Sequence, residues 1–137
     1  MGLVKLYVKT ESLIPHPKEN LMWGMATFGI KQIEEWEKSI KENGIIKPLL
    51  VNWKGCVIDG NMRFQLALKH DIEFVPIDLF YLMKDIEGFE NCLNKMFISK
   101  IVEGDNVFKK VIDELDLMKG IVKNKIEEHN SEDKKEC

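Results

Sequence analysis

Two patterns of apolar side chains predict strands and helices over the first 84 residues. In residues 3–8 and 74–82 apolar side chains recur at every second position, which is the pattern of a β-strand with one buried face. Residues 30–43 instead repeat apolar side chains every three or four positions with charged residues between them, which predicts an amphipathic helix. Gly44 follows this segment and is a natural residue to end a helix.

The segments between these elements are shorter and more mixed. Residues 48–53 and 56–58 are mostly apolar and flank a Lys-Gly pair, which predicts two strands joined by a tight turn. A helix is expected from about residue 62 to residue 70, and residues 18–29 are expected to form a loop or a short helix. Pro76 predicts that the last strand starts beside it or lies at an edge of the sheet.

The pattern changes after residue 84. Neither a proline nor a strand pattern follows, so we expect a domain of residues 1–84 and a helical C-terminal extension of residues 85–137, with a polar tail from about residue 129. The first helix of the extension is predicted by Phe89, Leu93, Met96 and Phe97, and the second by Val107, Val111, Leu115, Met118, Val122 and Ile126. The second stripe is longer than a small domain needs. It favours a homodimer through this helix, with burial against the first domain as the alternative.

The composition is that of an ordinary globular protein, with 45% hydrophobic and 31% charged residues among 137. A net charge of −3 argues against DNA binding through a broad basic face, without excluding DNA as a partner. No apolar run reaches the roughly 18 residues of a membrane span, and the first residues do not form a signal peptide. We therefore expect a cytoplasmic protein with no membrane partner. The three cysteines form no Cys-x-x-Cys pair, so no zinc site is expected.

Arg63 is the only arginine among the 20 basic residues of the chain. Lysine supplies the positive charge everywhere else, so the planar guanidinium at this one position is informative. A rigid fork of donors suits phosphate or carboxylate, and a structural salt bridge is the alternative.

Arg63 lies in a turn between a predicted strand and a predicted helix, with the sequence Asp-Gly-Asn-Met-Arg at residues 59–63. Gly60 lets the backbone approach a ligand closely, and the unpaired N–H groups at a helix start form an anion site. Arg63 is close enough to fold back over that site. Asp59 could bind Mg²⁺, accept a proton, or cap the helix, and Asn61 could also provide the cap.

Together these segments resemble the ParB/sulfiredoxin superfamily, in particular the ParB N-terminal (ParB-like nuclease) domain. The resemblance rests on the Leu-Ile-Pro-x-Pro segment at residues 13–17, the Gly-Ile-Ile-x-Pro-Leu-x-Val segment from Gly44, the turn at residues 59–63, and Val-Pro-Ile at residues 75–77. It implies a small α/β (α+β) fold with a mixed sheet, in which a Gly-x-x-Arg turn binds nucleotide phosphates. It also implies a nucleoside triphosphate or diphosphate with Mg²⁺ as the ligand.

Carried over residue by residue, the resemblance assigns roles around the turn. Gly60 and Arg63 would hold phosphates, and Asn61 and Met62 would present backbone N–H groups. Lys47 would lie at the rim of the site, and the loop around His16 would face it.

The sequence also departs from this family. Asn61 stands where similar sulfiredoxins have a catalytic cysteine, so sulfinic acid reductase activity is not expected. The C-terminal helices show no recognition helix, which argues against a partitioning clamp.

Three functions stay open. The first is a ParB-like nucleotide-binding protein in DNA-related processes, encoded by a mobile element, with DNA or a DNA-associated protein as its partner. The second is a small phosphotransfer enzyme similar to kinases with an Asp-Gly-His-x-Arg turn, or a nuclease, with Asp59 and Glu19 as catalytic residues. The third is an interaction module without chemistry.

Overall fold

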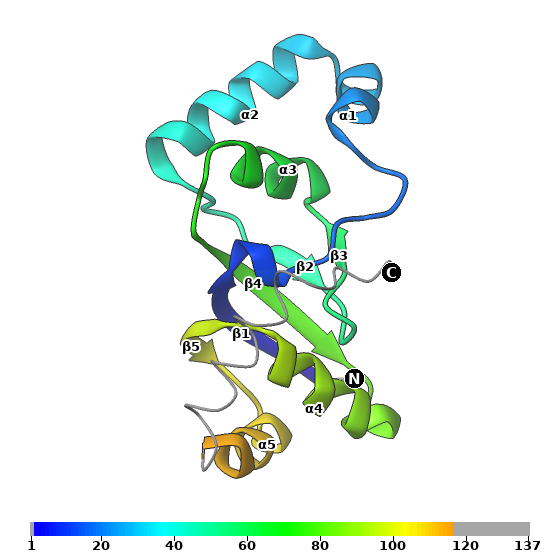
Figure 1. Ribbon diagram of the computed structural model, residues 1–137, viewed down its shortest axis with the longest axis vertical. Coiled ribbons are helices and arrows are strands. Elements are labelled where there is room, and N and C mark those ends of the chain that lie inside the picture. Colours follow the sequence, from blue (N-terminus) through cyan, green and yellow to red (C-terminus); the bar gives the residue numbers. More distant parts are fainter. Residues whose placement is uncertain (1, 117–137) are drawn as a thin grey trace.

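The computed structural model describes residues 2–116, which form one mixed sheet and the helices around it (Figure 1). In chain order the elements are β1 (Gly2–Lys9), the 3₁₀ turn η1 (Thr10–Ser12), α1 (Leu21–Phe28), α2 (Ile30–Asn43), β2 (Leu49–Val51), β3 (Val57–Asp59), α3 (Asn61–Lys69), β4 (Phe74–Tyr81), η2 (Met83–Asp85), α4 (Ile86–Lys95), β5 (Ile98–Glu103) and α5 (Asn106–Asp116). Among these residues, no helix is long and apolar enough to cross a membrane.

The five strands lie in the order β3-β2-β4-β1-β5. β1 runs antiparallel to both β4 and β5, whereas β2 runs parallel to β4 and antiparallel to β3. The alternating residues of β1 and β4 face each other in register and are buried, as the sequence pattern predicted. These pairs are Val4 with Leu79, Leu6 with Ile77, and Val8 with Val75.

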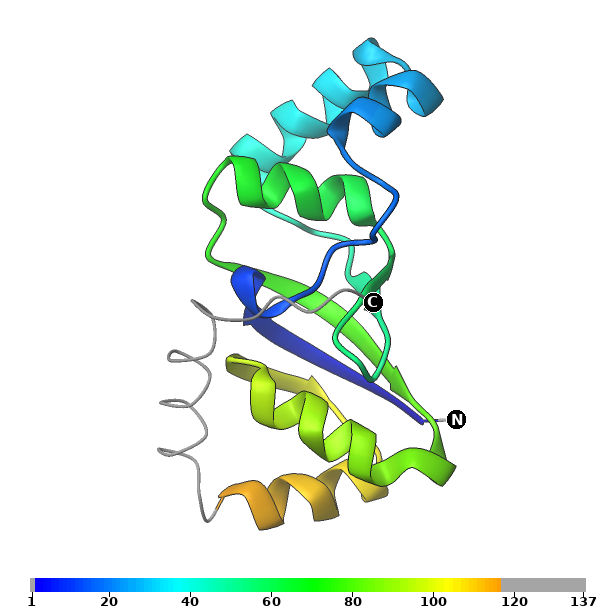
Figure 2. The ribbon, with the colours of Figure 1, turned by 45° about the vertical axis from the view of Figure 1, so that its right-hand side comes forward.

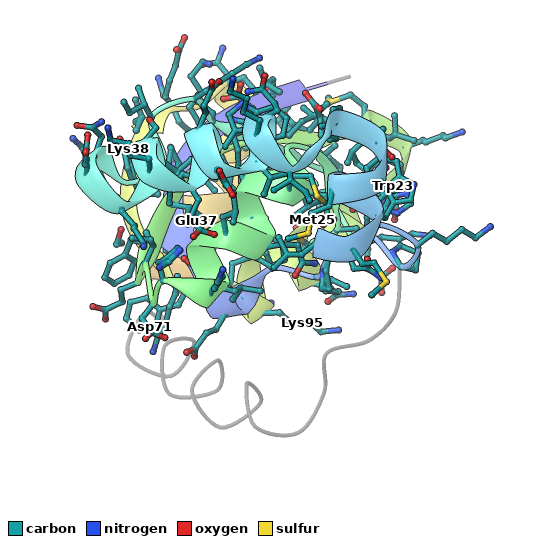
Figure 3. All side chains as sticks on the ribbon, turned by 90° about the horizontal axis from the view of Figure 1, so that it is seen from above. Trp23, Met25, Glu37, Lys38, Asp71 and Lys95 are labelled. Atoms are coloured by element: carbon teal, nitrogen blue, oxygen red, sulfur yellow. The ribbon has the colours of Figure 1, made fainter. Side chains whose placement is uncertain are left out.

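α3 lies between the sheet and an outer layer formed by α1 and α2, while α4 and α5 lie at the β5 end of the molecule (Figures 1 and 2). α2 has the bounds predicted from its spacing, and its Ile33 and Ile40 are buried. Glu37 of α2 forms an ion pair with Lys69 at the end of α3, with 3.0 Å between the charged atoms. Figure 3 shows Glu37 on the side of α2 that faces α3.

α1 packs closely on the start of α3. Asn20 caps α1 by accepting a hydrogen bond from the amide of Trp23 at 2.8 Å. Gly24 is buried in the middle of the helix, and a β-carbon there would overlap the side chain of Met62. The segment predicted as a loop or a short helix is therefore a helix, and its glycine permits the close approach.

Two sequence predictions about strands need correction. The sequence predicted no strand after residue 84, but β5 pairs with β1 and extends the sheet. β5 is an edge strand with mostly exposed side chains, so it lacks the alternation by which buried strands are recognised. Pro76 lies in β4, the central strand, at a position where β2 does not yet pair with it, so its missing N–H breaks no β2–β4 hydrogen bond.

The C-terminal part of the sequence is described only as far as α5. α4 contributes Phe89 and Leu93 to the same core as the sheet, and α5 contributes Phe108 and Val111. Met118, Val122 and Ile126, on which the dimer prediction depends, lie outside the described residues. The dimer and the division of the chain at residue 84 stay predictions.

Candidate functional site

A glycine in the left-handed backbone conformation connects β3 to α3. Gly60 has φ 91° and ψ 20°, a conformation that residues with a β-carbon rarely adopt. A β-carbon at Gly60 would also lie 2.7 Å from Cδ2 of Leu49 and 2.5 Å from Nη2 of Arg63. The turn therefore requires glycine for its backbone conformation and for the groups packed against it.

The Arg63 side chain folds back over this turn. Its Nη1 donates a hydrogen bond to the backbone carbonyl of Lys47 at 2.6 Å. Burial lowers the pKa of the Arg63 guanidinium, and the nearby Asp59 carboxylate acts in the opposite direction. Because arginine keeps its proton in proteins, a permanent positive charge lies at the start of α3.

The first amides of α3 have no acceptor in the described part of the chain. The amide of Phe64 makes the first helical bond, to the carbonyl of Gly60 at 2.9 Å. The amides of Asn61, Met62 and Arg63 precede it, and Gly60 has no side chain with which to cap them. The alternative that Asp59 or Asn61 caps this helix is therefore wrong.

The side chain of Asn61 binds the loop of residues 13–20, which we call the proline loop. Asn61 Oδ1 accepts a hydrogen bond from the amide of His16 at 3.1 Å, and Nδ2 donates to the carbonyl of Glu19 at 2.8 Å. Sequence reasoning assigned Asn61 a backbone role or a helix cap and missed this contact. The available signal was helical spacing, since Asn61 lies three residues before the buried Phe64 and thus on the apolar face of α3.

The beginning of the proline loop is attached to the β2–β3 hairpin. The amide of Ile14 donates to the carbonyl of Gly55, and the carbonyl of Ile14 accepts from the amide of Val57, each at 2.9 Å. Further along, Nδ1 of His16 accepts a hydrogen bond from the amide of Lys18 at 3.2 Å. An accepting Nδ1 assigns the proton of a neutral imidazole to Nε2.

The remaining predicted site residues are placed differently. Lys47 contributes its carbonyl to Arg63, while its side chain is exposed. Met62 is buried beneath Gly24, so it can offer a ligand only its amide. The carboxylates of Asp59 and Glu19 make no hydrogen bond or ion pair with any described residue.

A magnesium ion fits this arrangement only together with phosphate. No three His, Cys, Asp or Glu side chains gather into a metal site within residues 2–116. Mg²⁺, however, is often held by one or two carboxylates together with substrate phosphates and water. Asp59 is the carboxylate at the turn that meets this requirement.

Comparison with known proteins gives matches among solved structures alone. No family model and no curated protein matches this sequence. The chain is similar to the C-terminally truncated chromosome-partitioning protein ParB from Caulobacter crescentus complexed with CTP-gamma-S, with 23% identity and a TM-score of 0.46 over 65% of this chain and 50% of that one. It is also similar to a Pnob8-like ParB-N domain, with 21% identity and a TM-score of 0.46 over 94% of this chain and 52% of that one. This chain thus spans about half the length of each of these structures.

Proposed function

We propose that this protein binds a nucleoside triphosphate or diphosphate with Mg²⁺ at the turn of residues 59–63, as a ParB-like protein in DNA-related processes. The observation that carries the proposal is the folded-back Arg63, which lies beside three helix-start amides with no acceptor among residues 2–116. The partners proposed with it, DNA or a DNA-associated protein and a second copy of this chain, follow from the sequence alone.

The proposal rests on the hydrogen-bond donors and the positive charge that meet at the start of α3. The start of α3 carries a partial positive charge from the helix dipole, and its free amides point out of the helix toward an approaching anion. Arg63 uses one N–H on the Lys47 carbonyl, which leaves the rest of its fork for phosphate oxygens. Gly60 keeps the approach to these amides free of a side chain.

Asp59 would hold the magnesium ion together with the phosphates. Bound there, the ion would neutralise phosphate charge that Arg63 alone does not balance. The carboxylate of Asp59 also raises the pKa of the Arg63 guanidinium, against the lowering that burial causes.

Calorimetric titration tests this proposal directly. Wild-type protein is titrated with ATP, ADP, CTP and GTP in the presence of Mg²⁺, and with the matching nucleosides as controls. We expect saturable binding of at least one nucleotide and none of the nucleosides, because the proposed contacts are to phosphate. Absence of binding by every nucleotide, or equal binding of a nucleoside, would overturn the proposal.

One observation favours a phosphotransfer enzyme as a second candidate. The Asp59 carboxylate does not cap α3 and makes no hydrogen bond or salt bridge within residues 2–116, and its one electrostatic neighbour is Arg63 of the same turn, so it can serve as a base there. Asp59→Asn keeps the shape of the side chain and removes its charge. In an enzyme this variant would still bind nucleotide while turnover falls, and wild type that shows no hydrolysis or transfer to small hydroxyl acceptors would rule the candidate out.

A further inference from the structure

We infer that Asn61 is a positioning residue that holds the proline loop over the phosphate-binding turn and so makes this loop part of the ligand site. The inference rests on the proposed function, since it concerns the same turn. It differs from that proposal in assigning the essential role to the Asn61 side chain, which touches no ligand.

The burial of Asn61 needs an explanation because an unpaired carboxamide in the core is costly. Apart from the tyrosine hydroxyl of Tyr81, the buried polar side chains within the described residues are those of Thr10 and Asn61. The hydroxyl of Thr10 donates to the carbonyl of Ile72 at 2.6 Å and ties the end of β1 to the segment after α3. Asn61 makes the corresponding attachment at the start of α3, where its carboxamide holds the proline loop.

Both hydrogen bonds of Asn61 reach far along the chain. Short polar side chains at a helix start usually bond to a nearby amide of their own helix. Asn61 instead bonds to the backbone of residues 45 and 42 positions earlier, one as acceptor and one as donor. Neither an apolar side chain nor a simple hydroxyl offers this pair of groups in the same geometry.

The two hydrogen bonds of Asn61 lie at either end of residues 16–19, the part of the proline loop that carries polar groups. Between them lie His16, whose ring is oriented by the Lys18 amide, and the backbone leading to Glu19. The Asn61 amide is itself one of the three donors at the start of α3 that have no acceptor within residues 2–116. The side chain of Asn61 thus joins the phosphate turn to the loop segment that carries His16.

The test compares Asn61→Ala and Asn61→Asp with Asn20→Ala as a matched control. Asn61→Ala removes both loop contacts, whereas Asn61→Asp keeps the acceptor for His16 and replaces the donor to Glu19 with a carboxylate oxygen. Asn20→Ala removes the cap of α1 on the same loop and leaves the Asn61 contacts in place. Thermal unfolding of each variant establishes that it is folded.

Three measurements are made on each folded variant. Titration with CTP, ATP and GTP in Mg²⁺ gives the dissociation constant, and hydrogen exchange gives the protection of the His16 amide. Imidazole ¹⁵N shifts report the tautomer of His16, which a general loss of stability would not change. We expect Asn61→Ala to weaken nucleotide binding about tenfold or more, expose the His16 amide and average its tautomer signature. Asn61→Asp should retain the protection of His16 but still weaken binding, and Asn20→Ala should change the dissociation constant less than about twofold.

The outcomes separate this inference from the proposed function. If wild type binds nucleotide and the Asn61 variants bind equally well with a mobile loop, the inference is wrong while the proposed function stands. If Asn20→Ala weakens binding as much as Asn61→Ala, local stability is the cause and the inference is also wrong. If wild type binds no nucleotide, the proposed function fails and this inference fails with it.

Discussion

The start of α3 differs from the starts of α1, α4 and α5. Side chains close those three helices. Asn20 accepts from the Trp23 amide at 2.8 Å, Asp85 from the Gly88 amide at 3.1 Å, and Asp105 from the Phe108 amide at 2.8 Å. At α3 the cap residue is Gly60, which has no side chain, and the cationic Arg63 folds back over the turn, with the Asp59 carboxylate nearby. A carboxylate cap repels a second anion, whereas the open helix start with a cation attracts one.

The start of α2 shows that an open helix end alone is insufficient. Gly29 precedes α2 and also provides no side-chain cap. The residues that follow, Ile30 and Lys31, are exposed, and no arginine folds back over them. The difference between α2 and α3 therefore lies in Arg63 and in the proline loop held by Asn61, and variants at the two ends can separate these contributions.

The largest expected effect comes from closing the open helix start with a side chain. Gly60→Val places a branched β-carbon in a left-handed conformation and against Leu49 and Arg63, so we expect nucleotide binding to be lost. The conformational strain alone is about 1–2 kcal/mol or more, and thermal unfolding should show it. The equivalent change Gly29→Val at α2 is the control for binding, since a β-carbon there meets no atom within 4 Å. A folded Gly60→Val variant with normal affinity would contradict the assignment of this turn.

Removing the cation gives the next largest effect. Arg63→Ala should weaken nucleotide binding by about 1.5–3 kcal/mol, the range for hydrogen bonds to charged groups. Arg63→Lys should recover only part of this loss, because a point charge replaces the fork. Lys31→Ala in the first turn of α2 is the control and should leave the titration curve unchanged. Identical curves for wild type and both Arg63 variants would show that Arg63 is not a ligand contact.

Substitutions at the capped helix starts should change the free energy of unfolding without changing nucleotide affinity. Asp105, which caps α5, also accepts a hydrogen bond from the hydroxyl of the buried Tyr81 at 2.5 Å. Tyr81→Phe should reduce the free energy of unfolding by about 1 kcal/mol and leave nucleotide affinity unchanged. Denaturant unfolding and calorimetric titration measure the two quantities, and a change in affinity would mean that the two ends of the molecule are coupled.

The same hydroxyl should also give a pH dependence. Burial raises the pKa of Tyr81, and the hydrogen bond to Asp105 raises it further. An unfolded tyrosine ionises near pH ~10, so the contribution to stability is complete below that pH and is lost as the pH rises above it. Tyr81→Phe should flatten this decline, which denaturant unfolding at a series of alkaline pH values measures.

The smallest effect is expected at Asp59. Its exposed carboxylate makes no hydrogen bond or ion pair with the described residues, so Asp59→Asn should change the free energy of unfolding by no more than about 0.5 kcal/mol. In Mg²⁺ the variant should lose affinity for nucleotide, and in EDTA it should bind at least as tightly as wild type, because the carboxylate then only repels phosphate. A loss that persists in EDTA would indicate a direct structural role for Asp59.

The sequence predicted best those parts of the fold in which one face of an element is buried. The alternation in β1 and β4 and the spacing in α2 follow directly from burial, and each element formed close to its expected residues. β5 was missed because an edge strand is held mainly by backbone pairing, which leaves no pattern in its side chains. Sequence patterns describe how neighbouring residues are buried, and they do not report pairing between strands that are distant in sequence.

The candidate site shows the same limit. Arg63 was singled out because it is the one arginine of the chain, and Gly60 because a turn was expected there. The Asn61 contacts join residues more than 40 positions apart, which no local pattern encodes. The hydrogen bond from Arg63 to the Lys47 carbonyl could not be predicted from the sequence either, because every residue type carries the same backbone carbonyl.

The two edges of the sheet bear on how the protein behaves at high concentration. An exposed edge strand offers unpaired backbone groups to other chains, which is a route to aggregation. β3 has only three residues, so it offers a short template. β5 is longer and exposes Ile101 and Val102, yet its register with β1 shifts twice and Lys100 and Glu103 place charges along it. The irregular pairing with β1 and the charged side chains of β5 disfavour the addition of a further strand at this edge.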